Sequence, residues 1–369
     1  MFEFLNSAKS NLREQTQNQQ IQKRKKINKQ KDQKKPCPPL AIYNPSLHSL
    51  QNHIIHFIQR ISIMKAIMFS STSPALTLVI SITIFSAFLF APSSSTPRLL
   101  STLSPPKHPF LKYHNGPLLK GNYSINLIWY GKFIRSQQST IIDFIQSLSP
   151  NALTSSQPSV VSWWRTIDNY NPQAGPTNLE LLSQVFANKY NYGRSLKTSD
   201  IVALSNIIQG PDQINLVLTA ADVTVDGFCS SRCGAHVRGK YAASYIWVGN
   251  SASQCPGKCA WPFHQTPPLK APNRDVGVDG MVINIATLLA GAVTNPSGNG
   301  YYQGSAKAPL EAVSVCAGVF GAGAYPGYLG KVLVDPKSGA SYNAYGLNGR
   351  KYLLPAMWDP TTSKCSPLV

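Results

Sequence analysis

Two short apolar stretches, SINLIWY at residues 124–130 and INLVLT at residues 214–219, determine the class of fold. The first alternates β-branched and aromatic side chains with others and stops at Gly131, a pattern typical of a β-strand. The second is apolar at nearly every position, as in a strand that is buried on both faces. We therefore predict that both stretches are strands.

Around these strands, apolar side chains recur at the three- and four-residue spacing of helices. This spacing predicts helices over residues 136–148, 159–170, 198–208 and 279–293, with a further strand over residues 243–248. Because strands and helices alternate, we expect an α/β fold: a single layered domain with helices packed on a mixed β-sheet. The segment 291–349 is dense in Gly and Tyr, which predicts Gly-rich loops and short strands near the C-terminus.

The first 94 residues differ in composition from the rest. Residues 1–63 are rich in Gln, Asn and Lys and show no apolar period, so we expect a disordered basic leader, interpreted as an over-extended gene model. Residues 64–94 combine a basic flank, an apolar run and the small residues that follow Pro92, which is typical of a secretory signal peptide. The mature domain is then expected to span residues 95–369, enough to bury a substantial core without metal or cofactor.

Two other interpretations of this region remain open. The basic cluster at residues 22–26 could be a nuclear address. The apolar run at residues 75–91 could stay uncleaved as a single membrane anchor, because its length approaches what a bilayer requires. Pro92 and the three serines directly behind it favour cleavage.

Two kinds of covalent modification fit a secretory route. Apart from Cys37 in the leader, the cysteines are even in number, as three disulfides require: Cys229, Cys233, Cys255, Cys259, Cys316 and Cys365. Their pairing stays open, and the paired spacing of the first four also resembles a zinc site. Asn122 begins an N-glycosylation sequon, whereas Asn295 is excluded because Pro296 follows it.

Many of the same segments carry a family resemblance. The matching motifs are YHNGPLLKG (113–121), INLIWYGK (125–132), SVVSWW (159–164), LVLTAAD (216–222), FCSSRCG (228–234), YIWVGN (245–250), QCPGKC (254–259), DVGVDGM (275–281), APLEA (308–312) and YLLPAMWDP (352–360). Together they resemble the EXORDIUM, or phosphate-induced protein 1, family over about residues 100–369. The resemblance implies an extracellular, wall-associated plant protein connected with cell expansion, brassinosteroid-responsive growth and responses to phosphate or carbon supply. It implies no reaction.

The helix expected at 279–293 bears on the question of catalysis. From the resemblance we expect some distant relatives to carry a His-Glu-x-x-Glu pattern there, in which His binds zinc and Glu acts as general base. Here Thr287, Leu288 and Gly291 occupy those three places. None of them can bind zinc or take a proton at neutral pH, so this chain is expected to be at most an inactive relative of a zinc peptidase.

Other catalytic patterns are equally sparse. Asp275, Asp279 and Glu311 could flank a glycan in a two-carboxylate mechanism, but the first two are better explained as helix caps. No Gly-x-Ser-x-Gly elbow accompanies the histidines of the mature part, which are His108, His114, His236 and His264. The glycine-rich stretch 321–327 lacks the context of a phosphate-binding loop. We therefore predict no catalytic residue, metal or cofactor.

Aromatic side chains offer a way to bind sugar rings. Such a surface could be formed by Trp163, Trp164, Trp247, Trp261, Tyr301 and Tyr302. Trp163 fits an apolar helix face and is expected in the core. Tyr301 and Tyr302 lie in a Gly-rich segment and are the better candidates for glycan contact.

Charge suggests a partner. Residues 1–65 hold 12 of the 34 Lys and Arg and 3 of the 15 Asp and Glu, so the remainder keeps a net charge of +10. A basic face would hold such a protein on pectin by a salt-sensitive attraction, although net charge can also serve solubility alone. We expect a non-enzymatic apoplastic protein that binds an acidic wall polysaccharide or a receptor ectodomain. The alternatives are a wall-glycan hydrolase or transglycosylase using Asp275 and Glu311, and a membrane-anchored protein.

Overall fold

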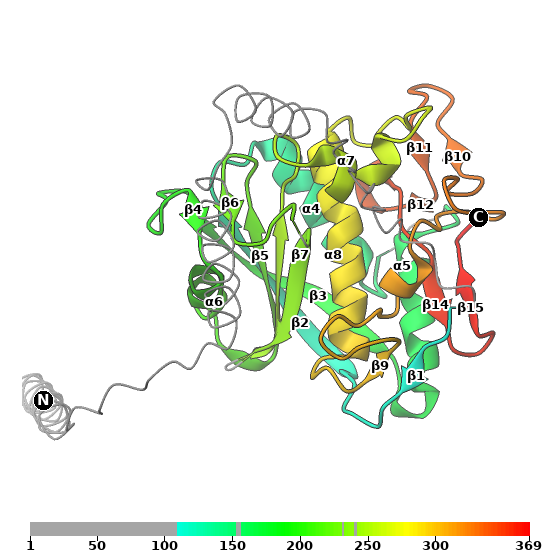
Figure 1. Ribbon diagram of the computed structural model, residues 1–369, viewed down its shortest axis with the longest axis horizontal. Coiled ribbons are helices and arrows are strands. Elements are labelled where there is room, and N and C mark those ends of the chain that lie inside the picture. Colours follow the sequence, from blue (N-terminus) through cyan, green and yellow to red (C-terminus); the bar gives the residue numbers. More distant parts are fainter. Residues whose placement is uncertain (1–108, 153–155, 231, 240–241) are drawn as a thin grey trace, which may run out of the picture. The chain divides into compact units, whose positions relative to one another are not determined.

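The computed structural model describes residues 109–369, apart from residues 153–155, 231 and 240–241. These residues belong to one compact unit, Pro97–Val369. Figure 1 shows its helices and strands. The expected leader at 1–63 and signal peptide at 64–94 lie outside the described residues.

The unit is built on a five-stranded mixed sheet with the strand order β3-β2-β5-β8-β7. The four parallel strands are β2 (Gly121–Tyr130), β3 (Thr177–Ala187), β5 (Gly210–Thr219) and β8 (Ala242–Gly249). The fifth strand, β7 (Gly234–Arg238), runs antiparallel to β8 at one edge. The two stretches that predicted strands, 124–130 and 214–219, are paired neighbours inside the sheet, as in Leu127 beside Leu216. The predicted mixed α/β fold is confirmed.

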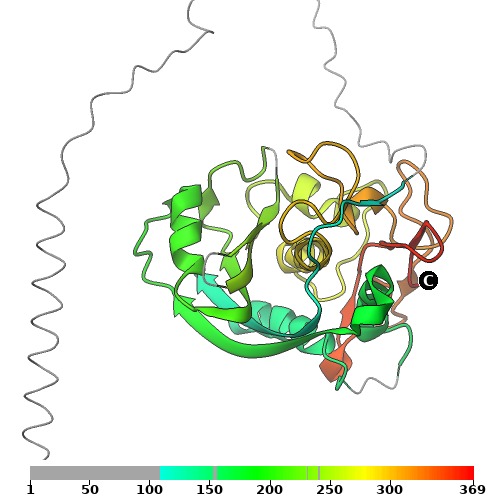
Figure 2. The same cartoon turned by 90° about the horizontal axis from the view of Figure 1, so that it is seen from below.

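Helices cover both faces of the sheet. On one face, α4 (Arg135–Ser147), α5 (Val160–Trp164) and α8 (Val276–Thr294) pack with Leu127 and Trp129 of β2. On the other, α6 (Thr198–Ser205) packs with Ile128 and Tyr130 of the same strand. Because side chains alternate along a strand, β2 supplies both cores. Figure 2 shows α8 nearly end-on within this arrangement.

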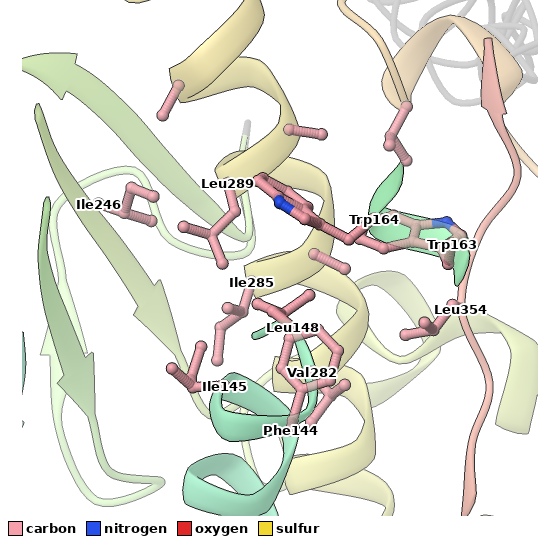
Figure 3. Packing of buried hydrophobic residues seen from close by; sticks show 14 of the residues in the cluster. Phe144, Ile145, Leu148, Trp163, Trp164, Ile246, Val282, Ile285, Leu289 and Leu354 are labelled. Carbon is pink, nitrogen blue, oxygen red and sulfur yellow. The ribbon is translucent and has the colours of Figure 1, made fainter. Parts of the chain in front are cut away.

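The main core surrounds α8, as the close view in Figure 3 shows. Its side chains include Phe144 and Leu148 from the α4 region, and Val282, Ile285 and Leu289 from α8. In the part of the chain that the structure describes, α8 alone is long and apolar enough to cross a bilayer, but most of its residues are buried inside the fold. A helix that is apolar on all sides is expected at such a position.

Two tryptophans considered for a sugar-binding surface lie in this core. Trp163 and Trp164 are both 1% exposed, which confirms the core position predicted for Trp163. Their indole nitrogens donate hydrogen bonds to the carbonyl groups of Pro355 and Thr177, at 2.7 and 2.8 Å. Trp247 is also buried, against Phe228. These three rings are therefore unavailable for stacking on sugars, and the hypothesis was wrong for them.

The helix expected at 159–170 is interrupted. The α-helix α5 continues as a 3₁₀ helix, η1 (Arg165–Tyr170), in which the carbonyl group of Ile167 accepts a hydrogen bond from Lys120. Pro172 follows Asn171, and the residue before a proline is disfavoured in helical geometry. Proline thus limits how far the helix can extend.

Short elements make up most of the remainder. The strands are β1 (Lys112–Tyr113), β4 (Ser195–Leu196), β6 (Thr224–Val225), β9 (Tyr301–Tyr302), β10 (Leu333–Val334), β11 (Ser341–Tyr342), β12 (Ala344–Tyr345), β13 (Lys351–Tyr352), β14 (Met357–Asp359) and β15 (Lys364–Ser366). The helices are α7 (Pro256–Cys259), η2 (Pro172–Ala174), η3 (Trp261–Phe263), η4 (Ser314–Cys316) and η5 (Leu347–Gly349). Strand β1 pairs with β9 beside the C-terminal end of α8.

Three disulfides connect the six cysteines of the described part, as predicted. Cys229–Cys255 and Cys233–Cys259 join the segment before β7 to α7, and Cys316–Cys365 joins η4 to β15. Because all four cysteines of the paired motif are bonded in twos, the zinc interpretation of their spacing was wrong.

Candidate functional site

A pocket of about 810 Å³ lies at the C-terminal end of α8. Its walls come from β7 with the residues just before it, from the end of α8, and from two loop segments, residues 295–298 and 306–311. Strand β7 is held at the sheet edge by its antiparallel pairing with β8. Helix α8 ends where the Asn295 N–H group bonds to the carbonyl group of Gly291, and the chain then turns into the pocket wall.

A histidine–glutamate pair forms part of the pocket lining. His236 on β7 places Nε2 2.8 Å from Oε2 of Glu311, and both side chains are only 11% exposed. The other carboxylate oxygen of Glu311 accepts a hydrogen bond from Asn295 at 2.7 Å. Each oxygen of this carboxylate therefore has a partner within the protein.

Glycine at position 291 makes room for this pair. A Cβ atom there would lie 2.4 Å from Oε2 of Glu311 and 2.9 Å from Nε2 of His236. Real Cβ atoms essentially never approach that closely. The close packing of α8 on the pair thus depends on the absence of a side chain at Gly291.

Three cationic side chains also line the pocket. Arg238 donates to the hydroxyl group of Ser297 at 3.0 Å, Arg232 donates to the carbonyl group of Asp226 at 3.0 Å, and Lys307 is exposed on the opposite loop. Glu311 is the one acidic side chain among the described residues of the lining. The cavity is therefore lined by an excess of positive charge, which concentrates anionic ligands.

Two polar atoms of this lining lack partners. Nε of Arg232 and Nδ1 of His236 are buried, and neither has a hydrogen-bond partner within the described part of the protein. Buried polar atoms of folded proteins are nearly always paired, so each exception needs an explanation such as a water molecule or a ligand. Both atoms belong to residues that line the same pocket.

Comparison with known proteins identifies the family. The model of the phosphate-induced protein 1 conserved region matches residues 111–368. This chain belongs to the phosphate-induced protein 1, or EXORDIUM, family. It is 55% identical to Protein PHOSPHATE-INDUCED 1 of Nicotiana tabacum over 74% of this chain and 92% of that protein. It is 53% identical to Protein EXORDIUM of Arabidopsis thaliana over 78% of this chain and 99% of that protein, and 57% identical to Protein EXORDIUM-like 2 of the same plant over 70% and 90%. No solved structure matches.

All lining residues of the pocket fall within the segment that matches the EXORDIUM family. Sequence reasoning singled out Glu311 but missed its partner, because His236 was considered only for a serine-hydrolase triad. The two residues are 75 positions apart, so no local spacing connects them. The one available signal was that each lies within or beside a family motif, FCSSRCG or APLEA.

The carboxylates suggested for glycan cleavage do not meet in this EXORDIUM-family fold. Asp275 caps the N-terminus of α8, with Oδ1 3.0 Å from the amide nitrogen of Val278, and its other oxygen accepts from Gln137. Glu311 instead lies against Gly291, 16 residues further along the helix. At 1.5 Å per residue this places the two acids roughly 24 Å apart, whereas paired glycosidase carboxylates lie within about 10 Å of each other. The capping role is confirmed for Asp275, and the proposed pair was wrong.

Asp279 has a different role from the predicted cap. It is 3% exposed and accepts hydrogen bonds from the backbone and side-chain nitrogens of Asn273, at 2.9 and 2.7 Å. Burial raises its pKa to about 7, although the Asn273 hydrogen bonds oppose this. Asp279 thus ties the preceding loop to α8 instead of capping the helix.

The helix positions compared with a zinc peptidase are occupied as follows. The hydroxyl group of Thr287 bonds back to the carbonyl group of Ile283 at 2.8 Å, Leu288 lines the pocket, and Gly291 lies under Glu311. Within the described residues, no group of three His, Cys, Asp or Glu side chains could hold a metal ion.

The predicted glycan-contact residues lie at the β1–β9 pair. Tyr301 stacks on Tyr113 with ring centroids 4.7 Å apart, and Tyr302 stacks on His114 at 3.9 Å. Both tyrosines are half-buried. Each therefore already has an aromatic neighbour on one ring face, and glycan contact stays a prediction.

The predicted glycosylation site is at the start of β2. Asn122 is exposed, and its Oδ1 accepts a hydrogen bond from Asn178 at 2.8 Å. An exposed position is what a glycan requires. Occupancy stays a prediction.

Proposed function

We propose that this chain is a secreted, apoplastic EXORDIUM-type protein that binds an acidic wall polysaccharide and thereby regulates cell expansion and brassinosteroid-linked growth. The observation that carries the binding role is the concentration of Arg232, Arg238 and Lys307 around one pocket. The ligand class is a polyuronate, a polymer in which each unesterified sugar residue carries one carboxylate.

The chemistry of the pocket suits such a ligand. Guanidinium and ammonium groups form charge-assisted hydrogen bonds with carboxylates, which are about twice as strong as neutral hydrogen bonds. The surplus of positive charge beyond residue 65 would add a longer-range attraction that salt weakens. A polyuronate is favoured over a receptor ectodomain because both the pocket and the chain as a whole are basic, whereas nothing in the pocket selects a protein surface.

The proposal assigns no reaction to the protein. Both oxygens of Glu311 are used within the protein, by His236 and Asn295, and a two-carboxylate mechanism would need a second acid in the same pocket. A wall-glycan hydrolase or transglycosylase is therefore the less favoured alternative.

The experiment uses protein recovered from plant culture medium, whose first residue is expected near position 95. Its affinity for oligogalacturonate is measured by calorimetry at low and high salt. Replacing two pocket cations, as Arg238→Gln with Lys307→Gln, should weaken binding about tenfold or more, because each lost charge-assisted hydrogen bond costs on the order of 1 kcal/mol.

The matched control removes the same charge elsewhere. Arg135→Gln with Lys337→Gln changes two exposed cations outside the pocket and should leave the affinity near that of the unaltered protein. If both double variants lost the same amount of affinity, net charge and not the pocket would explain the binding. Binding to a receptor ectodomain without any affinity for oligogalacturonate, or release of new sugar ends, would overturn the proposal.

A further inference from the structure

His236 is the titratable base of the pocket, and its surroundings are specific. On its own strand the nearby charge is Arg238, and the segment before the strand contributes Arg232. The two loops facing it supply Lys307 and Glu311, while α8 contributes the uncharged Leu288 and Gly291. In β8, its register partner is Ile246.

The hydrogen-bond pattern of His236 defines where a proton would go. Because Glu311 accepts from Nε2, the remaining position for a proton is Nδ1, which is buried without a partner. A proton there creates a donor that has no acceptor in the described part of the protein, which is unfavourable for a buried group. It also adds a positive charge to a pocket that Arg232, Arg238 and Lys307 line, with Glu311 as the one negative side chain among the described lining residues.

A bound anion reverses this balance. Negative charge in the pocket attracts the imidazolium and offsets the repulsion by the three neighbouring cations. By linkage, a ligand that favours the protonated histidine binds more tightly when protons are abundant. Imidazole side chains ordinarily change charge between about pH 5 and 8, which is the range that a test has to cover.

We propose that the pocket binds the carboxylate of a uronate sugar together with one proton taken up by His236, so that polyuronate affinity rises as pH falls. This inference rests on the proposed function and adds its ligand group and its regulation. An EXORDIUM-family protein of this kind would hold the polysaccharide more tightly in an acidified wall and release it as the pH rises.

The test titrates the protein with trigalacturonate in a calorimeter at pH 5.5, 6.5 and 7.5. Each titration is repeated in two buffers with different ionisation enthalpies, which yields the number of protons taken up. We expect uptake of up to one proton, and affinity about tenfold higher at pH 5.5 than at pH 7.5, which lies within the roughly hundredfold limit that a single proton sets over two pH units. The fully methyl-esterified trimer, which lacks the carboxylates, should bind weakly at every pH.

Variants assign the proton to one residue. His236→Gln should remove proton uptake and flatten the affinity between pH 5.5 and 7.5. His264→Gln, which changes an exposed histidine outside the pocket, should keep both the uptake and the pH dependence. Arg238→Gln should lower the affinity at each pH while proton uptake persists.

The ring resonances of His236 in NMR spectra supply a second reading on the unaltered protein. They should shift towards the imidazolium position when trigalacturonate is added near pH 7, and this also decides the matter if His236→Gln fails to fold. Binding without proton uptake would overturn this inference and leave the proposed function standing. Absence of binding at all three pH values would overturn both.

Discussion

At the scale of single residues, Asp279 makes the stability of the fold depend on pH. Burial raises its pKa from 3.8 to about 7. Between those values the folded state keeps a proton that the unfolded state has lost, so this group stabilises the protein fully below about pH 4 and the contribution disappears as pH rises through 7. A shift of about three units corresponds to on the order of 4 kcal/mol. We expect urea unfolding at pH 4.5, 6 and 7.5 to show this decline.

Asp279→Asn resembles the protonated form and should flatten the decline. Asp335 provides the opposite case, because its hydrogen bond from Lys351 lowers its pKa. Its contribution is present above the ordinary aspartate pKa and is lost as pH falls further, so Asp335→Asn should leave the slope between pH 4.5 and 7.5 unchanged. If the stability of Asp279→Asn still fell between pH 4.5 and 7.5, another group would be the cause of the decline.

Contacts of single residues could be predicted from the sequence only where the partners are close together in the chain. The capping role of Asp275 was predictable because its partner, the amide nitrogen of Val278, is three residues away. The pairing of His236 with Glu311 was not, because it depends on how β7, α8 and a distant loop pack together. An even number of cysteines predicted three disulfides, but their partners are set by the same long-range packing.

At the scale of elements, α8 carries an unusual requirement at Gly291. Alanine is ordinarily the better helix residue, by about 1 kcal/mol. Here an added Cβ would meet Glu311 and His236, so the clash should outweigh that gain. We expect Gly291→Ala to destabilise the protein by about 1–3 kcal/mol in chemical denaturation, as overpacking usually does. Gly291→Ala should also weaken trigalacturonate binding, because the added Cβ displaces the His236–Glu311 pair that lines the pocket.

Gly257 in α7 is the matched control, since a Cβ there would have no heavy atom within 4 Å. Gly257→Ala should be neutral or stabilise the protein by up to about 1 kcal/mol, mainly by restricting the unfolded chain. Similar destabilisation by both substitutions would show that the contact with Glu311 is not the cause.

The elements that sequence predicted well are those with an unambiguous apolar pattern. The last six residues of β2 and of β5 are all buried, and so is most of α8, so the apolar pattern of these stretches directly indicates burial. β3 received no assignment, because it is an edge strand whose exposed positions include both Leu182 and Phe186. The short strand β7, which carries His236, is only partly buried and was missed for the same reason.

At the scale of the whole molecule, the disulfides brace the segments that form the pocket. Arg232 lies between Cys229 and Cys233, and Glu311 lies five residues before Cys316. The bonds at Cys229 and Cys233 both reach α7, which contacts α8. Although the pocket residues come from distant parts of the chain, two of its walls are thus attached covalently to other elements.

This arrangement predicts unequal contributions to stability. Cys316–Cys365 alone closes its loop of 49 residues, so replacing both cysteines by serine should cost about 4 kcal/mol in the chain-entropy model. Cys229–Cys255 and Cys233–Cys259 each span 26 residues and are offset by only four. Removing the first pair should cost well below the roughly 3.5 kcal/mol expected for an isolated loop of that length, because the second still closes nearly the same loop.

Guanidinium unfolding under non-reducing conditions, with the loss of each pair measured separately and then together, checks this order. The combined loss of Cys229–Cys255 and Cys233–Cys259 should exceed the sum of the two single losses, since only the double variant opens the loop. Additive losses would mean that the two bonds act independently. Equal costs for Cys229–Cys255 and Cys316–Cys365 would likewise contradict loop closure as the source of the stabilisation.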